Sequence, residues 1–186
     1  MKTFDERNAI EAGVYMAQKL FSVSSIDCVE TALSGLGWSE MRDKNPSISR
    51  IYISNNFPSC VFKVPAWRDF ECYNQFVLGI KDLQGDDAQH FPRIFAHNPK
   101  FGTLLERGYI SEIDNDIESW RYKLNGMIFE SIPDVSLLSV GEQSMYRAAI
   151  IISQIFPRGS PEININDVIR KYDGTPMILE AYSGRF

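Results

Sequence analysis

Two charged residues of this sequence stand within short apolar stretches, where an ionisable side chain most needs a partner. Lys63 interrupts Cys60-Val-Phe-Lys-Val64, and Glu180 follows Met177-Ile-Leu. Burying a charge is costly unless an opposite charge or several hydrogen bonds compensate it. We therefore expect Glu180, if it is buried, to pair with Lys63 or Arg170. The alternating strand pattern around Lys63 equally fits the solvated side of a hairpin.

The common phosphate-binding and nucleophile motifs of enzymes are missing from the sequence. It contains no Gly-x-x-x-x-Gly-Lys-Ser/Thr, no Gly-x-Gly-x-x-Gly and no Gly-x-Ser-x-Gly pattern. The two histidines, His90 and His97, stand near proline and asparagine and indicate no nucleophile–base pair. The acidic run of Glu112, Asp114 and Asp116 fits a solvated helix start, where carboxylates interact well with the helix dipole.

The cysteines point to a reducing compartment. Cys28, Cys60 and Cys72 are odd in number and form no Cys-x-x-Cys pair, which predicts free thiols in the cytosol. A zinc site would have to combine these scattered cysteines with two isolated histidines, so we expect no metal site. The acidic residues near the start argue against a signal peptide, and the longest apolar run, Ala148-Ala-Ile-Ile-Ile, is far too short to span a membrane.

Composition indicates an ordinary globular protein. The chain has 186 residues, of which 44% are hydrophobic and 23% are charged, enough for one domain or for two small lobes that share a core. Its net charge is −5. Binding to nucleic acid or to anionic lipid needs a basic surface that releases counterions, so we expect neither as a partner, and we expect a cytoplasmic protein.

The hydrophobic patterns alternate between helix and strand. Helices are predicted at residues 5–20, from 25 to about 35, at 67–80, 114–129 and 141–156, the last as the central core element. Strands are predicted at 49–54 and 59–64, at 92–97 and 103–106, and at 164–169 and 177–179, each pair joined by a turn. The sequence thus predicts an α+β fold.

This order of elements resembles the protein-kinase fold in a reduced form, in particular the small kinase domains encoded by bacterial viruses. Cys60-Val-Phe-Lys-Val64 resembles the third-strand lysine motif, which would place Lys63 over the nucleotide phosphates. Glu71 then stands where the kinase helix glutamate pairs with that lysine. His90-Phe-Pro-Arg-Ile94 resembles the segment that leads into the fourth strand, and Leu104-Leu-Glu106 resembles the fifth strand and hinge.

Near the C-terminus, the stretch from Asn166 to Glu180 resembles a catalytic-loop asparagine, a hairpin and the metal-binding acid. The resemblance covers about residues 45–183. It implies a small antiparallel-sheet N-lobe at 41–110 and a truncated, mostly helical C-lobe at 111–186. A helical segment, 1–40, packs on these lobes to give one compact unit. It also implies a vestigial nucleotide cleft at Lys63, Glu71, Asn166 and Glu180.

Three departures from the kinase pattern argue against catalysis. The segment in place of the glycine-rich loop, residues 43–49, has no glycine and contains Pro46, which lacks a backbone donor. Pro161 stands where the catalytic aspartate would accept a proton. Glu180 replaces the metal-binding aspartate, and magnesium tolerates such a displacement poorly. We therefore expect no catalytic residue, and we expect Lys63, Glu71 and Glu180 to form a structural ion cluster between the lobes.

The leading hypothesis is a pseudokinase without a cofactor that works by binding another protein. The resemblance to viral kinases implies a host-directed or defence-related partner. One alternative is an atypical ATP- and magnesium-dependent phosphotransferase, with Lys63 on the phosphates and Asn166 and Glu180 on the metal. A further alternative is an unrelated α+β interaction module. In that case Glu71 and Glu106 are surface charges, and the chain around Lys63 does not face that around Glu180.

Overall fold

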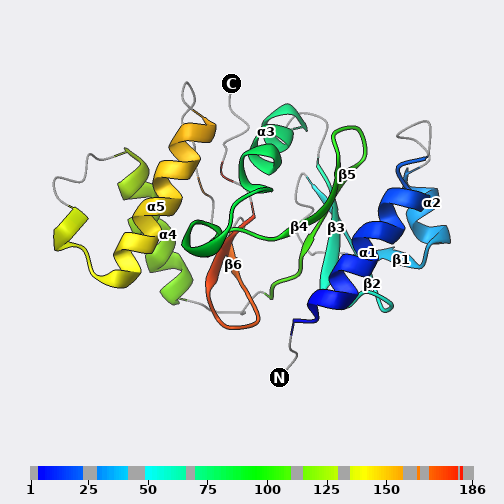
Figure 1. Cartoon of the computed structure of the whole chain (residues 1–186), viewed down its shortest axis with the longest axis horizontal. Helices are drawn as coiled ribbons and strands as arrows, with labels where there is room; N and C mark the ends of the chain where they lie inside the picture. The colour runs from blue at the N-terminus through cyan, green and yellow to red at the C-terminus, as the bar shows by residue number, and fades with distance from the viewer. Residues whose placement is uncertain are drawn as a thin grey trace. The chain divides into compact units, whose positions relative to one another are not determined.

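The computed structural model describes residues 4–22, 29–41, 49–65, 70–109, 115–129, 135–156, 163, 168–179 and 181, and it has the predicted α+β class (Figure 1). The chain divides into two compact units. A sheet unit comprises Met1–Glu71 and Arg93–Arg107, and a helical unit comprises Cys72–Pro92 and Gly108–Phe186. Neither unit is continuous in sequence, because the chain leaves the sheet within one helix and returns to add two strands.

Among the described residues, the sheet unit holds five antiparallel strands in the order β1-β2-β3-β5-β4. The strands are β1 (Trp38–Glu40), β2 (Arg50–Ser54), β3 (Cys60–Val64), β4 (Ile94–Asn98) and β5 (Gly102–Glu106). The two predicted hairpins, β2–β3 and β4–β5, are confirmed. The sequence analysis missed β1, because three residues are too few to show an alternating pattern.

Helix α1 (Glu6–Lys19) covers one face of this sheet (Figure 1). Its predicted cap is confirmed, since the backbone N–H of Asn8 donates to the Asp5 carboxylate over 3.0 Å. Close approach to β4 depends on a small residue, because a β-carbon at Gly13 would lie 2.7 Å from the carbonyl oxygen of Phe95. The apolar residues of α1, of α2 (Val29–Gly35) and of the strands form one core: Ala9, Ala12, Met16, Leu20, Val29, Leu33, Trp38, Tyr52, Cys60, Phe62, Phe101 and Leu104.

The helical unit contains α4 (Asn115–Phe129), α5 (Val140–Ile155) and all but the first two residues of α3 (Phe70–Ile80). The described residues of this unit also include two short 3-10 helices, η3 (Gly85–Ala88) after α3 and η4 (Val135–Leu137) between α4 and α5 in the sequence. Helices α4 and α5 pack side by side (Figure 1). Helix α5 is less central than predicted. It buries one stripe that includes Met145, Ala148 and Ile152, but Ile150, which lies between them in sequence, is 38% exposed.

A hairpin of β6 (Val168–Arg170) and β7 (Pro176–Ile178) completes the helical unit. The predicted Asp-Gly turn is confirmed: Gly174 has a φ of +91°, and the N–H of Thr175 donates to the Asp173 carboxylate over 2.9 Å. Of the strand predicted at 164–169, residues 168 and 169 lie in β6, and residues 164–167 lie outside the described part. No helix among the described residues is long and apolar enough to cross a membrane.

Candidate functional site

Lys63 lies in the middle of the sheet, on β3 between β2 and β5. It pairs across the strands with Ile51 on one side and Thr103 on the other, and Thr103 pairs in turn with His97 on β4. Side chains that face each other across antiparallel strands lie about 5 Å apart on the same side of the sheet. The structure therefore places a lysine, a threonine and a histidine in one cross-strand row.

This polar row lies on the face of the sheet opposite to α1. Phe62 and Leu104, the neighbours of Lys63 and Thr103, point into the α1 core, and successive side chains of a strand point to opposite faces. Lys63 is only 4% exposed and Thr103 is fully buried. The Nδ1 atom of His97 lies 2.9 Å from the Thr103 hydroxyl. The Thr103 hydroxyl and the His97 imidazole therefore satisfy each other within this row.

Gly102 sets the position of Lys63 in the sheet. Its φ of +133° is rare for residues with a side chain, and a β-carbon there would collide with the backbone carbonyl of Lys63. The same β-carbon would lie 3.1 Å from the Phe62 ring. The close pairing of β3 with the start of β5 therefore requires glycine.

Of the other predicted site residues, the structure describes Glu71 but not Asn166 or Glu180. Glu71 stands in the first turn of α3 and is exposed, whereas Lys63 is buried, so the two groups occupy different environments. Asn166 and Glu180 lie outside the described residues, as do Pro46 and Pro161. The cleft of four residues and the ion cluster between the lobes thus stay predictions.

Glu106 is a buried carboxylate rather than the surface charge that one alternative predicted. It is 5% exposed, and its Oε2 accepts a hydrogen bond of 3.2 Å from the backbone N–H of Arg93. The N–H of Glu106 donates in return to the carbonyl of Arg93 over 2.9 Å. Glu106 lies opposite Cys60 across the β3–β5 pair. The pattern Leu104-Leu-Glu106 gives no sign of this burial, because the carboxylate ends an apolar strand.

A second buried polar group, in the helical unit, was also missed. His90 is 4% exposed; its Nδ1 lies 2.9 Å from the carbonyl oxygen of Pro176 and its Nε2 lies 2.9 Å from the Ser144 hydroxyl. Desolvation lowers the pKa of His90, and the hydrogen bond to Pro176 opposes this shift in part. The partners are 86 and 54 residues away in sequence, so no local pattern could reveal them.

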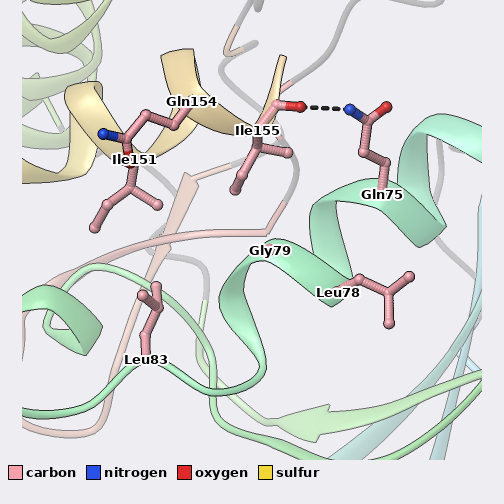
Figure 2. Close-up of a pocket in the computed structure, with 7 residues that line it drawn as sticks. All are labelled: Gln75, Leu78, Gly79, Leu83, Ile151, Gln154 and Ile155. Carbon is pink, nitrogen blue, oxygen red and sulfur yellow. Dashed lines mark hydrogen bonds between the residues drawn. The ribbon is translucent and has the colours of Figure 1, made fainter. Parts of the chain in front are cut away.

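An apolar groove of about 420 Å³ runs between α3 and α5 in the helical unit (Figure 2). At one end the side-chain amide of Gln75 donates to the carbonyl oxygen of Ile155, as the dashed line in Figure 2 shows. A β-carbon at Gly79 would collide with the Ile155 side chain, so the two helices approach closely at this point. The residues that line the groove are all uncharged: Gln75, Leu78, Gly79, Leu83, Ile151, Gln154 and Ile155.

Within the described part of the chain, no three histidine, cysteine or acidic side chains gather as metal ligands would. Models of protein families, curated proteins and solved structures were each compared with this chain, and none of them matched.

Proposed function

We propose that the chain is a kinase-like scaffold that transfers no phosphate and acts by binding another protein. The order of elements around Lys63 supports the kinase-like part. Strand β3 carries Lys63, α3 follows with Glu71 in its first turn, and β4 and β5 come next, with β5 beside β3. This is the order that the sequence resemblance implies for the strand lysine, the helix glutamate and the last two strands of the sheet.

Three departures from the kinase sequence pattern support the absence of phosphate transfer. A kinase needs backbone N–H groups close to the phosphates, a base for the substrate hydroxyl and carboxylate ligands for magnesium. The chain has Pro46 in a loop without glycine, Pro161 in place of the base and Glu180 in place of the metal-binding aspartate. Each change affects a different part of the reaction, so one neighbouring residue cannot compensate for all three.

The groove between α3 and α5 is the observation that carries the binding function. Leu78, on the rim of the groove, is 53% exposed. A partner that covered this side chain would remove apolar surface from water, which favours binding. A charged partner side chain would lose its hydration there and gain no opposite charge. The occupant that fits is therefore the uncharged, apolar face of a helix in a partner protein. This helix would lie along the groove, whose own Gln75 and Gln154 would stand at its edges.

Paired variants test this proposal. Leu78→Lys places a charge in the groove, and Ile10→Lys places one on α1 of the sheet unit, where Ile10 is 54% exposed. Both positions are exposed, so both variants should fold. A partner captured by the wild-type protein should bind Ile10→Lys equally well and Leu78→Lys at least tenfold more weakly in titrations of the purified components. A partner that binds all three proteins alike would refute the groove as its site.

A phosphotransferase is the second candidate, and the position of Lys63 is the feature that favours it. In the order of elements described above Lys63 stands where a kinase has its strand lysine, and its ammonium could donate hydrogen bonds to a phosphate oxygen. Incubation with labelled ATP and magnesium separates the two functions. The proposed scaffold yields no labelled product, whereas a product that forms with the wild type and not with Lys63→Met would establish the enzyme.

A further inference from the structure

His90 connects three elements of the helical unit. Its backbone carbonyl accepts the N–H of Ile178 over 2.8 Å, and its Nδ1 lies 2.9 Å from the carbonyl oxygen of Pro176, so both bonds go to β7. Its Nε2 lies 2.9 Å from the Ser144 hydroxyl on α5. The ring also lies 5.0 Å from the ring of Trp120 on α4. The β6–β7 hairpin is thereby tied to α5 through one imidazole.

The partners fix where the ring hydrogen must be. A carbonyl oxygen can only accept, so Nδ1 carries the hydrogen that reaches Pro176. In the neutral ring Nε2 is then an acceptor, and the Ser144 hydroxyl donates to it. The same hydroxyl lies 2.8 Å from the carbonyl oxygen of Gly141 and can turn its single hydrogen there instead. If Nε2 also carried a hydrogen, Ser144 could accept it while donating to Gly141, so a protonated ring could keep both bonds, but only as a buried cation.

The surroundings of His90 disfavour a positive charge. The ring is buried, and the charged groups that act on it are Arg147 from α5 and Lys171 from the hairpin, both cationic. Asp86 of η3 lies 3.6 Å from Arg147 and offsets part of that charge. Helix α4 presents the uncharged Trp120 to the ring. A protonated His90 would thus be a buried cation next to other cations.

We propose that His90, Ser144 and Pro176 form a proton-operated clamp, which holds the β6–β7 hairpin on α5 while His90 is neutral and releases it when His90 takes up a proton. The sign follows from linkage. Burial lowers the pKa of His90 in the closed state below the value of about 6.5 for an open, solvated histidine. The open state therefore binds more protons, and closure is fully favoured above about pH 6.5 and weakens as the pH falls below it.

Nuclear magnetic resonance of the protein with ¹⁵N-labelled histidine tests the clamp directly. The sequence has only two histidines, so a His97→Gln variant assigns the signals. We expect His90 at pH 7.5 to be neutral with its hydrogen on Nδ1. Amide exchange of Ile178, corrected for intrinsic chemistry, should then accelerate on acidification by up to tenfold per pH unit below 6.5, relative to the amides of β3.

His90→Asn is the matched variant, because it keeps a donor for Pro176 but cannot titrate. Its Ile178 exchange should lose the pH dependence. The proposal is overturned if the hydrogen of His90 is on Nε2, if wild-type Ile178 is equally protected at pH 7.5 and pH 5.5, or if His90→Asn keeps the wild-type dependence. Should His90→Asn fail to fold, the two wild-type measurements decide the question. This inference does not rest on the proposed function.

Discussion

Cys60 and Glu106 occupy directly opposed positions on β3 and β5, and both side chains are buried. Burial is the main cause that raises the pKa of the Cys60 thiol to about 12, and the charge of Glu106 adds to it. The thiolate is the reactive form of cysteine. The folded protein therefore holds Cys60 as an inert, neutral thiol.

The first prediction concerns the reactivity of this thiol. At pH 8 and in the folded protein, Cys60 should stay unmodified by iodoacetamide for hours, and it should react promptly once the chain is unfolded in urea. Mass spectrometry of the peptide that contains Cys60 measures both rates. Labelling of the native protein as fast as that of the unfolded chain would contradict the buried pairing of Cys60 with Glu106.

The second prediction concerns the close contact between Gly102 and the backbone of Lys63. In Gly102→Ala the new methyl group must displace the carbonyl of Lys63, and the residue must adopt a φ of +133°. Overpacking of this kind costs about 1–3 kcal/mol, and the backbone conformation adds to the loss. Urea unfolding of the variant should show a decrease of at least that size in the free energy of unfolding.

Gly126→Ala is the control for this substitution. Gly126 lies inside α4, and no atom stands within 4 Å of the position that its β-carbon would occupy. Alanine should stabilise the helix by up to about 1 kcal/mol relative to glycine. Equal losses of stability in the two variants would show that the effect at Gly102 does not come from the contact with Lys63.

The third prediction concerns the start of α5. Ser139 and Glu142 form a capping box, in which the hydroxyl of Ser139 accepts the N–H of Glu142 and the Glu142 carboxylate accepts the N–H of Ser139 over 3.0 Å. Loss of the cap in Ser139→Ala should cost about 1 kcal/mol in the free energy of unfolding. An unchanged free energy would contradict the box.

The same box gives the fourth prediction, a dependence on acid. Hydrogen bonds from Ser139, followed by the interaction with Lys123, lower the pKa of Glu142 to about 2. A carboxylate with a depressed pKa stabilises the folded state above its unfolded pKa, near 4.3, and loses this effect as the pH falls towards 2. Glu142→Gln should remove that part of the pH dependence. A wild-type acid profile in the variant would place the cause elsewhere.

The sequence predicted the local elements well, because their signals are local. The cap at Asp5 and the turn at Asp173-Gly174 each rest on a few adjacent residues, and both are confirmed. Helix α5 was predicted to be the central core element, because it contains a run of alanines and isoleucines. In the structure only one of its faces is buried, and Ile150 is exposed. Composition shows how apolar a helix is but not which of its faces meets a neighbour.

The site was harder to predict, because its contacts join distant segments. Lys63 was singled out as a charge in an apolar strand, and its burial shows that the alternative, the solvated side of a hairpin, is wrong. The burial of Glu106 and the contact of His90 with Ser144 depend on pairings between strands and helices that no spacing encodes. Tertiary register alone brings these residues together, so reasoning from local sequence could not find them.

The central claim, a kinase-like scaffold without phosphotransfer, is tested most directly by thermal melting with and without magnesium and ATP at millimolar concentration. A ligand at 100 times its dissociation constant would stabilise the protein by about 2.7 kcal/mol. We predict no shift of the melting temperature. A magnesium-dependent rise in the wild type that is absent in Lys63→Met would contradict the account and favour the phosphotransferase.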